Sequence, residues 1–188
     1  RVTEVGARGR VEAPAGAIRV DLSGKTVMPA IINAHMHLAS DRPALVDQLE
    51  HLAYYGVGMA VSLGQDTSDV VFRVRAEPVA GAARVRTAGR GITMPEPGRS
   101  EAAYWVTTET AARAAVQEQA ERGVDLIKIW VDDRDGQYEK LPPRLYGPII
   151  DEAHQEGLDV AAHVFTLADA KELMRAGVDV FAHGVRDR

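Results

Sequence analysis

The chain has 188 residues, of which 46% are hydrophobic and 26% are charged, so its composition is that of a globular protein with a sizeable core. This composition excludes intrinsic disorder as the main state. The net charge of −5 comes without a long run of either sign, so we expect neither a nucleic-acid partner nor a membrane partner. Without cysteine, only His, Asp, Glu and Lys remain for metal chemistry, and disulfides and thiolate sites are excluded.

Residues 1–25 are polar and rich in turn-forming residues. Val-containing pieces at Val2 to Val5 and at Ala17 to Leu22 predict small antiparallel strands. We therefore expect residues 1–25 to be part of an accessory β-sandwich domain, and residues 26–188 to form a second unit.

From Thr26 onward, apolar runs alternate with amphipathic helical stretches, which predicts βαβ units around a parallel sheet. The predicted strands are Val27–Asn33, Val57–Leu63, Arg84–Ala88, Leu126–Val131, Leu158–His163 and Val178–His183. The predicted helices are Pro43–Tyr55, Ser68–Glu77, Thr108–Arg122, Pro143–Glu156 and Leu167–Arg175. The Gly- and Pro-rich stretch Gly89–Val106 is too long for a plain connection, which indicates a functional loop.

Glycines mark the corners between predicted helices and strands. Gly56, Gly123, Gly157 and Gly177 each follow a helical stretch and precede an apolar run, so we expect positive φ angles at helix ends. The heptapeptides that begin at Gly157 and Gly177 match in pattern, and each ends in histidine.

Four histidines occupy the ends of predicted strands. His35 and His37 are two residues apart, so both imidazoles can point to the same side of a strand, although such a pair alone is equally typical of ordinary loop chemistry. His163 and His183 end the two matching strands, where α/β barrels place their functional groups. Either one alone would be interpreted as a core imidazole satisfied by backbone groups. The four together predict a metal centre.

Lys128 lies in the most apolar strand of the second half of the chain, although lysine is rarely buried without a partner. One interpretation is that its side chain faces outward or extends past a helix to solvent. The other is that it is buried, loses its proton readily, and reacts with carbon dioxide to give a carbamate that bridges two cations.

The remaining polar candidates are weaker. His51 and His154 fall inside predicted helices and are expected to be solvent-facing or packed. The carboxylates after the fourth long strand are expected to form a solvated acidic loop, and the charged pair after His183 is at most a substrate contact. These residues are Asp132, Asp133 and Asp135, and Arg186 and Asp187.

The ordered motifs resemble the metal-dependent amidohydrolase superfamily, in its imidazolonepropionase-like and prolidase-like branch. The stretch Leu22-Ser-Gly-Lys-Thr-Val-Met-Pro-Ala-Ile-Ile-Asn-Ala-His35-Met-His37 resembles the family's entry into its first barrel strand, and Ile127-Lys128-Ile129 resembles the strand of its carbamylated lysine. Ala153-His-Gln-Glu-Gly-Leu-Asp-Val-Ala-Ala-His163 and Ala176-Gly-Val-Asp-Val-Phe-Ala-His183-Gly resemble its fifth- and sixth-strand ligand motifs.

The resemblance implies an α/β fold, a TIM-like (β/α)8 barrel of the metal-dependent hydrolase type, beside a small β-sandwich. It implies one or two divalent ions, usually zinc, with manganese, iron or nickel as alternatives. His35 and His37 would bind the more buried ion, Lys128 would bridge as a carbamate, and His163 and His183 would bind the second. The substrate would be a small-molecule amide, hydrolysed at its C–N bond by an activated water.

The sequence also departs from the family pattern. Ala30 and Asn33 stand where a glycine and an aspartate are usual, and the strand-eight aspartate that manages the water's proton has no counterpart. Because a complete barrel has about 250 residues, we expect an incomplete barrel of six βα units, which makes a homo-oligomer plausible. The alternative to a hydrolase is a non-catalytic chain that keeps this fold for binding or assembly.

Overall fold

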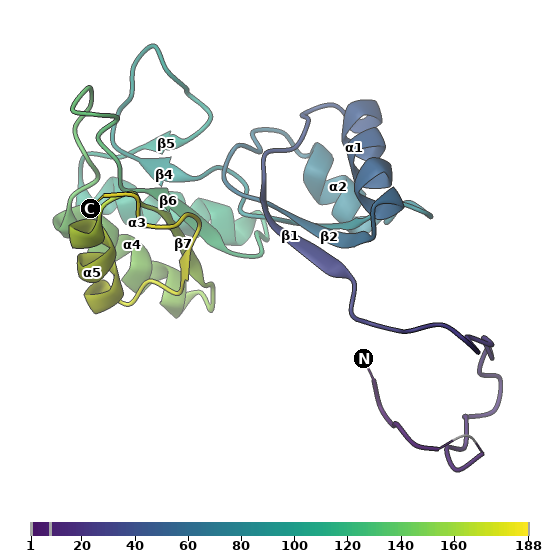
Figure 1. The fold of residues 1–188 in the computed structure, drawn as a ribbon. Coiled ribbons are helices and arrows are strands. Elements are labelled where there is room, and N and C mark those ends of the chain that lie inside the picture. The colour runs from purple at the N-terminus through teal and green to yellow at the C-terminus, as the bar shows by residue number, and fades with distance from the viewer. Residues whose placement is uncertain (1, 8, 188) are drawn as a thin grey trace.

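The computed structural model describes residues 2–7 and 9–187, and in this part of the chain eight parallel strands form two sheets that are covered by five helices (Figure 1). The strands are β1 (Ile31–Met36), β2 (Val57–Ser62), β3 (Arg84–Thr87), β4 (Ile92–Thr93), β5 (Tyr104–Trp105), β6 (Ile127–Trp130), β7 (Val160–His163) and β8 (Val180–Phe181). The helices are α1 (Arg42–Tyr54), α2 (Val70–Ala76), α3 (Glu109–Glu121), α4 (Pro143–Gln155) and α5 (Leu167–Ala176). The predicted α/β class with parallel strands is confirmed.

The strands are divided between a three-stranded sheet of order β1-β2-β3 and a five-stranded sheet of order β5-β4-β6-β7-β8. The stretch Gly89–Val106, predicted as a loop, supplies β4 and β5, and β4 pairs with both β5 and β6. Strands of two residues are too short to show a periodicity, so no local pattern predicts them. In the described residues β3 and β4 are not paired, and a closed barrel is therefore not confirmed.

Local sequence signals place the helix ends within two residues of the predicted bounds. Asp41 accepts a hydrogen bond from the backbone N–H of Ala44 and caps α1, and Thr108 caps α3 in the same way. The four corner glycines have positive φ angles, from 72° at Gly123 to 93° at Gly177, which confirms the prediction for helix ends.

The aspartate of the corner motif accepts a hydrogen bond from the backbone of another strand. Asp125 Oδ2 accepts a hydrogen bond from the backbone N–H of Thr87 at 2.9 Å, and Asp179 Oδ2 accepts one from Val160 at 2.8 Å. In both cases a carboxylate satisfies a strand N–H group that the helix-to-strand corner would otherwise leave without a partner.

Two hydrophobic cores lie under the helices, and a third cluster joins the two sheets. The largest core lies between the five-stranded sheet and α3, α4 and α5, and a smaller one lies between the three-stranded sheet and α1 and α2. Leu63 and Ala88, which follow β2 and β3, pack against Ala161 of β7. This contact brings the carboxyl ends of strands from the two sheets into one region, where the predicted metal ligands lie.

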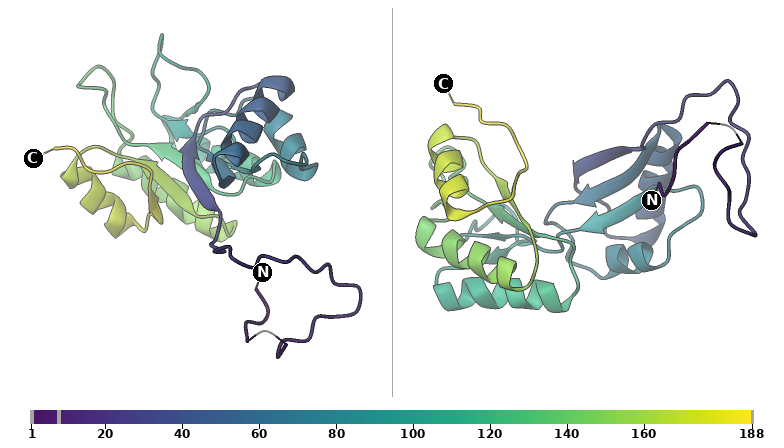
Figure 2. Two further views of the ribbon diagram at one scale, coloured as in Figure 1. Left: turned by 45° about the vertical axis from the view of Figure 1, so that its right-hand side comes forward. Right: turned by 90° about the horizontal axis from the view of Figure 1, so that it is seen from below.

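The N-terminal segment runs away from both sheets in Figure 1 and in the left view of Figure 2. Residues 2–7 and 9–30 contain no strand, so the small strands predicted at Val2 to Val5 and at Ala17 to Leu22 are not formed. The first strand begins at Ile31 and not at Val27. A strand needs a neighbouring edge to satisfy its backbone groups, and no such edge lies beside this segment. The assignment of residues 1–25 to a separate domain stays a prediction.

Among the described residues, no helix has the length and apolar character that crossing a membrane requires.

Candidate metal centre

Lys128 lies at the middle of β6 with its side chain fully buried. Its exposed fraction is 0%, and Nζ has no hydrogen-bond partner among the described residues. The indole of Trp130 lies 5.5 Å from Nζ, measured to the ring centroid. The interpretation in which Lys128 faces solvent is therefore wrong, because the strand is buried on both faces.

Burial, together with the nearby positive charge of Arg134, lowers the pKa of Lys128 to about 7. A substantial fraction of the amine is consequently neutral near pH 7. A neutral amine carries a lone pair, which is the form that reacts with carbon dioxide.

The four strand-end histidines gather in one cluster. The ring of His183 lies 4.7 Å from that of His35 and 4.5 Å from that of His163, measured between centroids. His37 lies 5.2 Å from His35. His35 and His37 come from the end of β1, whereas His163 ends β7 and His183 follows β8. The cluster therefore joins the carboxyl ends of strands from both sheets.

The environment keeps these imidazoles neutral. Burial lowers the pKa of His163 and that of His183 to about 4, and the charge of Lys128 contributes to both shifts. Burial also lowers the pKa of His35 and His37. A neutral imidazole has one nitrogen with a free lone pair, which is the form that binds a metal ion.

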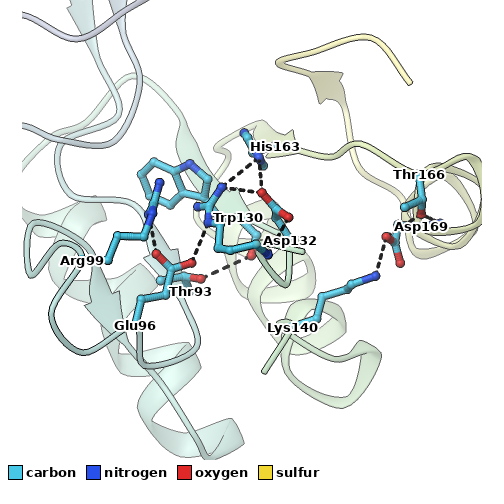
Figure 3. A network of polar contacts seen from close by, with 10 residues as sticks. Thr93, Glu96, Arg99, Trp130, Asp132, Lys140, His163, Thr166 and Asp169 are labelled. Atoms are coloured by element: carbon cyan, nitrogen blue, oxygen red, sulfur yellow. Dashed lines mark hydrogen bonds and ion pairs between the residues drawn. The ribbon is translucent and has the colours of Figure 1, made fainter. Parts of the chain in front are cut away.

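Asp132 is buried beside this cluster. The prediction that it belongs to a solvated acidic loop is therefore wrong. Its exposed fraction is 9%, and its Oδ2 lies 2.9 Å from His163 Nε2 (Figure 3). The neighbouring residues Asp133 and Asp135 are more exposed. Lys128, Trp130 and Asp132 are spaced i, i+2 and i+4, so strand alternation was the signal that could have placed Asp132 on the side of Lys128.

Arg134 links Asp132 to the segment that contains β4 and β5. Its Nε donates to Glu96 Oε1 at 3.0 Å, and its Nη1 donates to Asp132 Oδ2. Glu96 is buried and also accepts a hydrogen bond from Arg99. Neither Glu96 nor Arg134 was predicted as a site residue, because they lie 38 residues apart and only the tertiary fold brings them together.

Two glycines make room for the side chains around Lys128. A β-carbon at Gly91 would lie 2.1 Å from Cζ3 of Trp130, and one at Gly64 would lie 2.6 Å from Cη2 of the same ring. The indole can therefore pack over the lysine only because both positions lack a side chain.

The donor set fits a divalent cation, although the described side chains are not arranged as a finished site. In residues 2–7 and 9–187, no three His, Asp or Glu side chains converge closely enough to hold an ion. The imidazoles instead pack edge to face or tilted against one another. Four neutral imidazoles and the unpartnered amine of Lys128 nevertheless form a donor set that suits zinc and similar metals.

The other polar candidates lie outside this cluster or at its rim. His51 is exposed on α1, and His154 on α4 pairs with Asp179 at 3.0 Å. Arg186 stacks on Phe165, 4.3 Å from the ring centroid, and Asp187 accepts a hydrogen bond from the backbone of Leu167.

The fold and the cluster define an α/β protein of parallel βα units with its polar groups gathered at the carboxyl ends of the strands. No family model matches the sequence. Uncharacterized proteins of Mycobacterium tuberculosis and Mycobacterium bovis are 29% identical to it over 190 residues, which cover 94% of this chain. The match covers 50% of each of those proteins, so the chain spans about half the length of the curated relatives it matches.

Solved structures show the same fold. A putative prolidase from Bifidobacterium longum is 31% identical, with a TM-score of 0.71, over 84% of this chain and 40% of that one. A prolidase in complex with N-methylphosphonate-L-proline is 21% identical, with a TM-score of 0.75, over 94% of this chain and 53% of that one. An amidohydrolase with 20% identity has a TM-score of 0.72, over 93% and 52% of the two chains. The predicted resemblance to prolidase- and amidohydrolase-type proteins is thereby confirmed at the level of the fold.

Proposed function

We propose that the protein is a metal-dependent amidohydrolase that cleaves the C–N bond of a small-molecule amide. The observation that carries this proposal is the amine of Lys128, which is buried without a hydrogen-bond partner in the described part of the chain, beside four imidazoles that burial keeps neutral. A buried unpartnered amine opposes folding, so its presence points to a role in binding or chemistry. The similarity to a putative prolidase supports the same reaction class.

The proposed ligands are the five side chains of the cluster. His35 and His37 would hold one divalent ion, His163 and His183 would hold a second, and Lys128 would bridge the two as a carbamate. Zinc is the first candidate because imidazole nitrogen and carboxylate-type oxygen both suit it, and manganese, iron and nickel are alternatives.

The carbamate forms without a further reactant beyond carbon dioxide. The lone pair of neutral Lys128 Nζ forms a bond to the carbon of carbon dioxide, and one proton leaves the nitrogen for solvent. The product carries one negative charge on two oxygens, which replaces an unpartnered amine by a group that two cations can share. The side chain of Trp130 covers the lysine and excludes bulk water from it.

Bound divalent cations would supply Lewis-acid polarisation of the substrate carbonyl and a more acidic water for the attack. The chain's own residues supply the rest of the site. The neutral imidazoles would hold the cations in place. The buried strand that contains Lys128 fixes the position of its side chain between them. Cyclic amides, N-acyl amino acids and dipeptides are the proposed substrates.

Metal analysis tests the proposal. The chain purified without chelator and then loaded with zinc or manganese should contain one or two equivalents of metal. Lys128→Ala and His163→Ala should each lower that content, whereas His51→Ala, which changes an exposed histidine, should not. A metal content near zero in the loaded wild-type protein would contradict the proposal. Metal binding without hydrolysis of any of the three substrate types would support the non-catalytic alternative.

A further inference from the structure

The ring of His163 is held by a carboxylate from the loop after β6. His163 Nε2 lies 2.9 Å from Asp132 Oδ2. Arg134 donates two hydrogen bonds to the same carboxyl group, one from its backbone N–H and one from its charged guanidinium. A carboxylate that forms an ion pair with arginine only accepts hydrogen bonds, so His163 Nε2 donates in this contact.

Asp132 is itself fixed at both oxygens. Its Oδ1 accepts the backbone N–H of Arg134 at 3.0 Å, and its Oδ2 accepts Arg134 Nη1 together with His163 Nε2. The 3.2 Å approach between Nη1 and Nε2 follows from this geometry, because two donors converge on one oxygen. The carboxylate therefore cannot turn away from the ring without breaking contacts at both of its oxygens.

Arg134 is held in turn from its other side. Its Nε donates to the buried carboxylate of Glu96, and its side chain is only 13% exposed. The backbone turns back to make this contact: Arg134, Asp135 and Gly136 have φ angles of 55°, 58° and 78°. Left-handed conformations at two successive non-glycine residues persist only where the surroundings fix them. Figure 3 shows Glu96, Asp132 and His163 in this network.

We propose that Asp132, locked by Arg134 and Glu96, is a positioning residue that fixes His163 as its Nε2–H tautomer and leaves Nδ1 as the lone-pair donor to a divalent cation. The cation in this statement rests on the proposed function, whereas the tautomer rests on the contacts alone. A carboxylate that holds the second nitrogen of a ligand histidine fixes ring orientation and raises its basicity, and its removal typically weakens metal binding.

His35 provides a contrast within the same cluster. Its Nδ1 lies 3.4 Å from the backbone oxygen of Ala182, which can only accept, so Nδ1 carries the proton and Nε2 has the lone pair. The cluster therefore presents opposite ring nitrogens from β1 and from β7, and the difference is set by the partner of each ring.

Long-range 1H–15N spectra of the metal-free 188-residue chain at pH 7 test the tautomer directly. His163 is assigned by the signals that disappear in His163→Gln. We expect one tautomer with the proton on Nε2 in the wild type. Asp132→Asn should give a mixture, because an amide can donate to Nε2 as well as accept from it. Asp133→Asn removes the same charge one residue further along and should leave the wild-type pattern unchanged.

Chelator competition then measures the effect on metal affinity. Asp132→Asn should weaken zinc binding by about 10- to 100-fold. Arg134→Lys, which lacks the planar fork that donates from Nε to Glu96 and from Nη1 to Asp132, should weaken it in the same direction, and Asp133→Asn should not change it. Thermal unfolding of the metal-free proteins shows whether each variant is folded.

Three results separate the possibilities. A wild-type His163 with its proton on Nδ1 would overturn the inference whatever the metal content. Equal zinc affinity in wild type and in folded Asp132→Asn would overturn it as well. A wild type that shows the expected tautomer but binds no metal would contradict the proposed function, while it would support the positioning of His163 by Asp132.

Discussion

The backbone of Gly64 lies against the side chain of Lys128: a β-carbon at Gly64 would stand 2.8 Å from Lys128 Cγ. The φ angle of Gly64 is 96°, which side-chain-bearing residues rarely adopt. The turn after β2 and the middle of β6 therefore depend on each other, and the lysine keeps its buried position only while position 64 lacks a side chain.

We expect Gly64→Ala to lower the free energy of unfolding by about 1–3 kcal/mol, because the added carbon overpacks the site and the backbone is strained. Urea denaturation measures this change. Gly147→Ala is the comparison: it lies inside α4, and among the described residues no atom outside its own helix backbone and its chain neighbours lies within 4 Å of a β-carbon there. Alanine inside a helix gains about 0.5–1 kcal/mol over glycine, but Pro148 restricts the residue before it, so the net change in the free energy of unfolding should be small. Equal effects of the two substitutions would contradict the close contact.

The stability of the metal-free chain should rise with pH because of Lys128. Its pKa is about 7 in the folded state and 10.5 for the free side chain, so between these values the unfolded state binds one more proton than the folded state. The expected slope is at most about 1.4 kcal/mol per pH unit. In Lys128→Met this contribution disappears, and the variant should be more stable than the wild type near pH 7.

Denaturation in carbonate-free buffer containing chelator, at several pH values from 7 to 10, compares the two proteins. The difference between wild type and Lys128→Met isolates this lysine from all other titrating groups. A difference that does not change with pH would show that Lys128 titrates at its ordinary pKa in the folded protein.

The core under α3, α4 and α5 should carry most of the stability. Ile149 is 0% exposed, so Ile149→Ala should lower the free energy of unfolding by about 2–5 kcal/mol. Ile18, which is 91% exposed in the N-terminal segment, offers the comparison. Ile18→Ala should change stability by less than about 0.5 kcal/mol. A large effect of Ile18→Ala in thermal or urea unfolding would show that this segment packs on the sheets in solution.

The corner aspartates should differ in importance although their motifs match. Asp179→Ala removes the acceptor for the N–H of Val160 and the partner of His154, and it should lower the free energy of unfolding by about 1–3 kcal/mol. Asp159 occupies the same place in the preceding motif but is exposed. Asp159→Ala should therefore have little effect in the same unfolding measurement, and a loss as large as that of Asp179→Ala would be unexpected.

Much of the fold follows from local signals. Apolar runs and amphipathic periods predicted the long strands and the five helices, because the spacing of apolar residues along the chain reflects which faces of an element are buried. The positive φ angles at Gly56, Gly123, Gly157 and Gly177 were also predicted from a local signal, because glycine adopts this conformation at a helix end without strain. The placement of four histidines at strand ends was likewise visible in the sequence.

Other features depend on contacts between distant segments. The sequence alone allowed the side chain of Lys128 to be either solvent-facing or buried. In the structure it is buried, because Trp130, Gly64 and Gly91 pack around it. The division into two sheets depends on β4 and β5, which are too short to have a period. The N-terminal segment has strand-like residues, yet a strand forms only where a neighbouring edge exists.

The sequence by itself determined which residues could form a metal centre, since residue type and position along a strand are local properties. The tertiary structure alone decided how they are held. Asp132 was interpreted as a solvated residue, and it became the partner of His163 because β6 and β7 are neighbours and because Glu96, 38 residues from Arg134, anchors that arginine. Hydrogen bonds across such separations are set by the packing of the sheets, and no local pattern contains them.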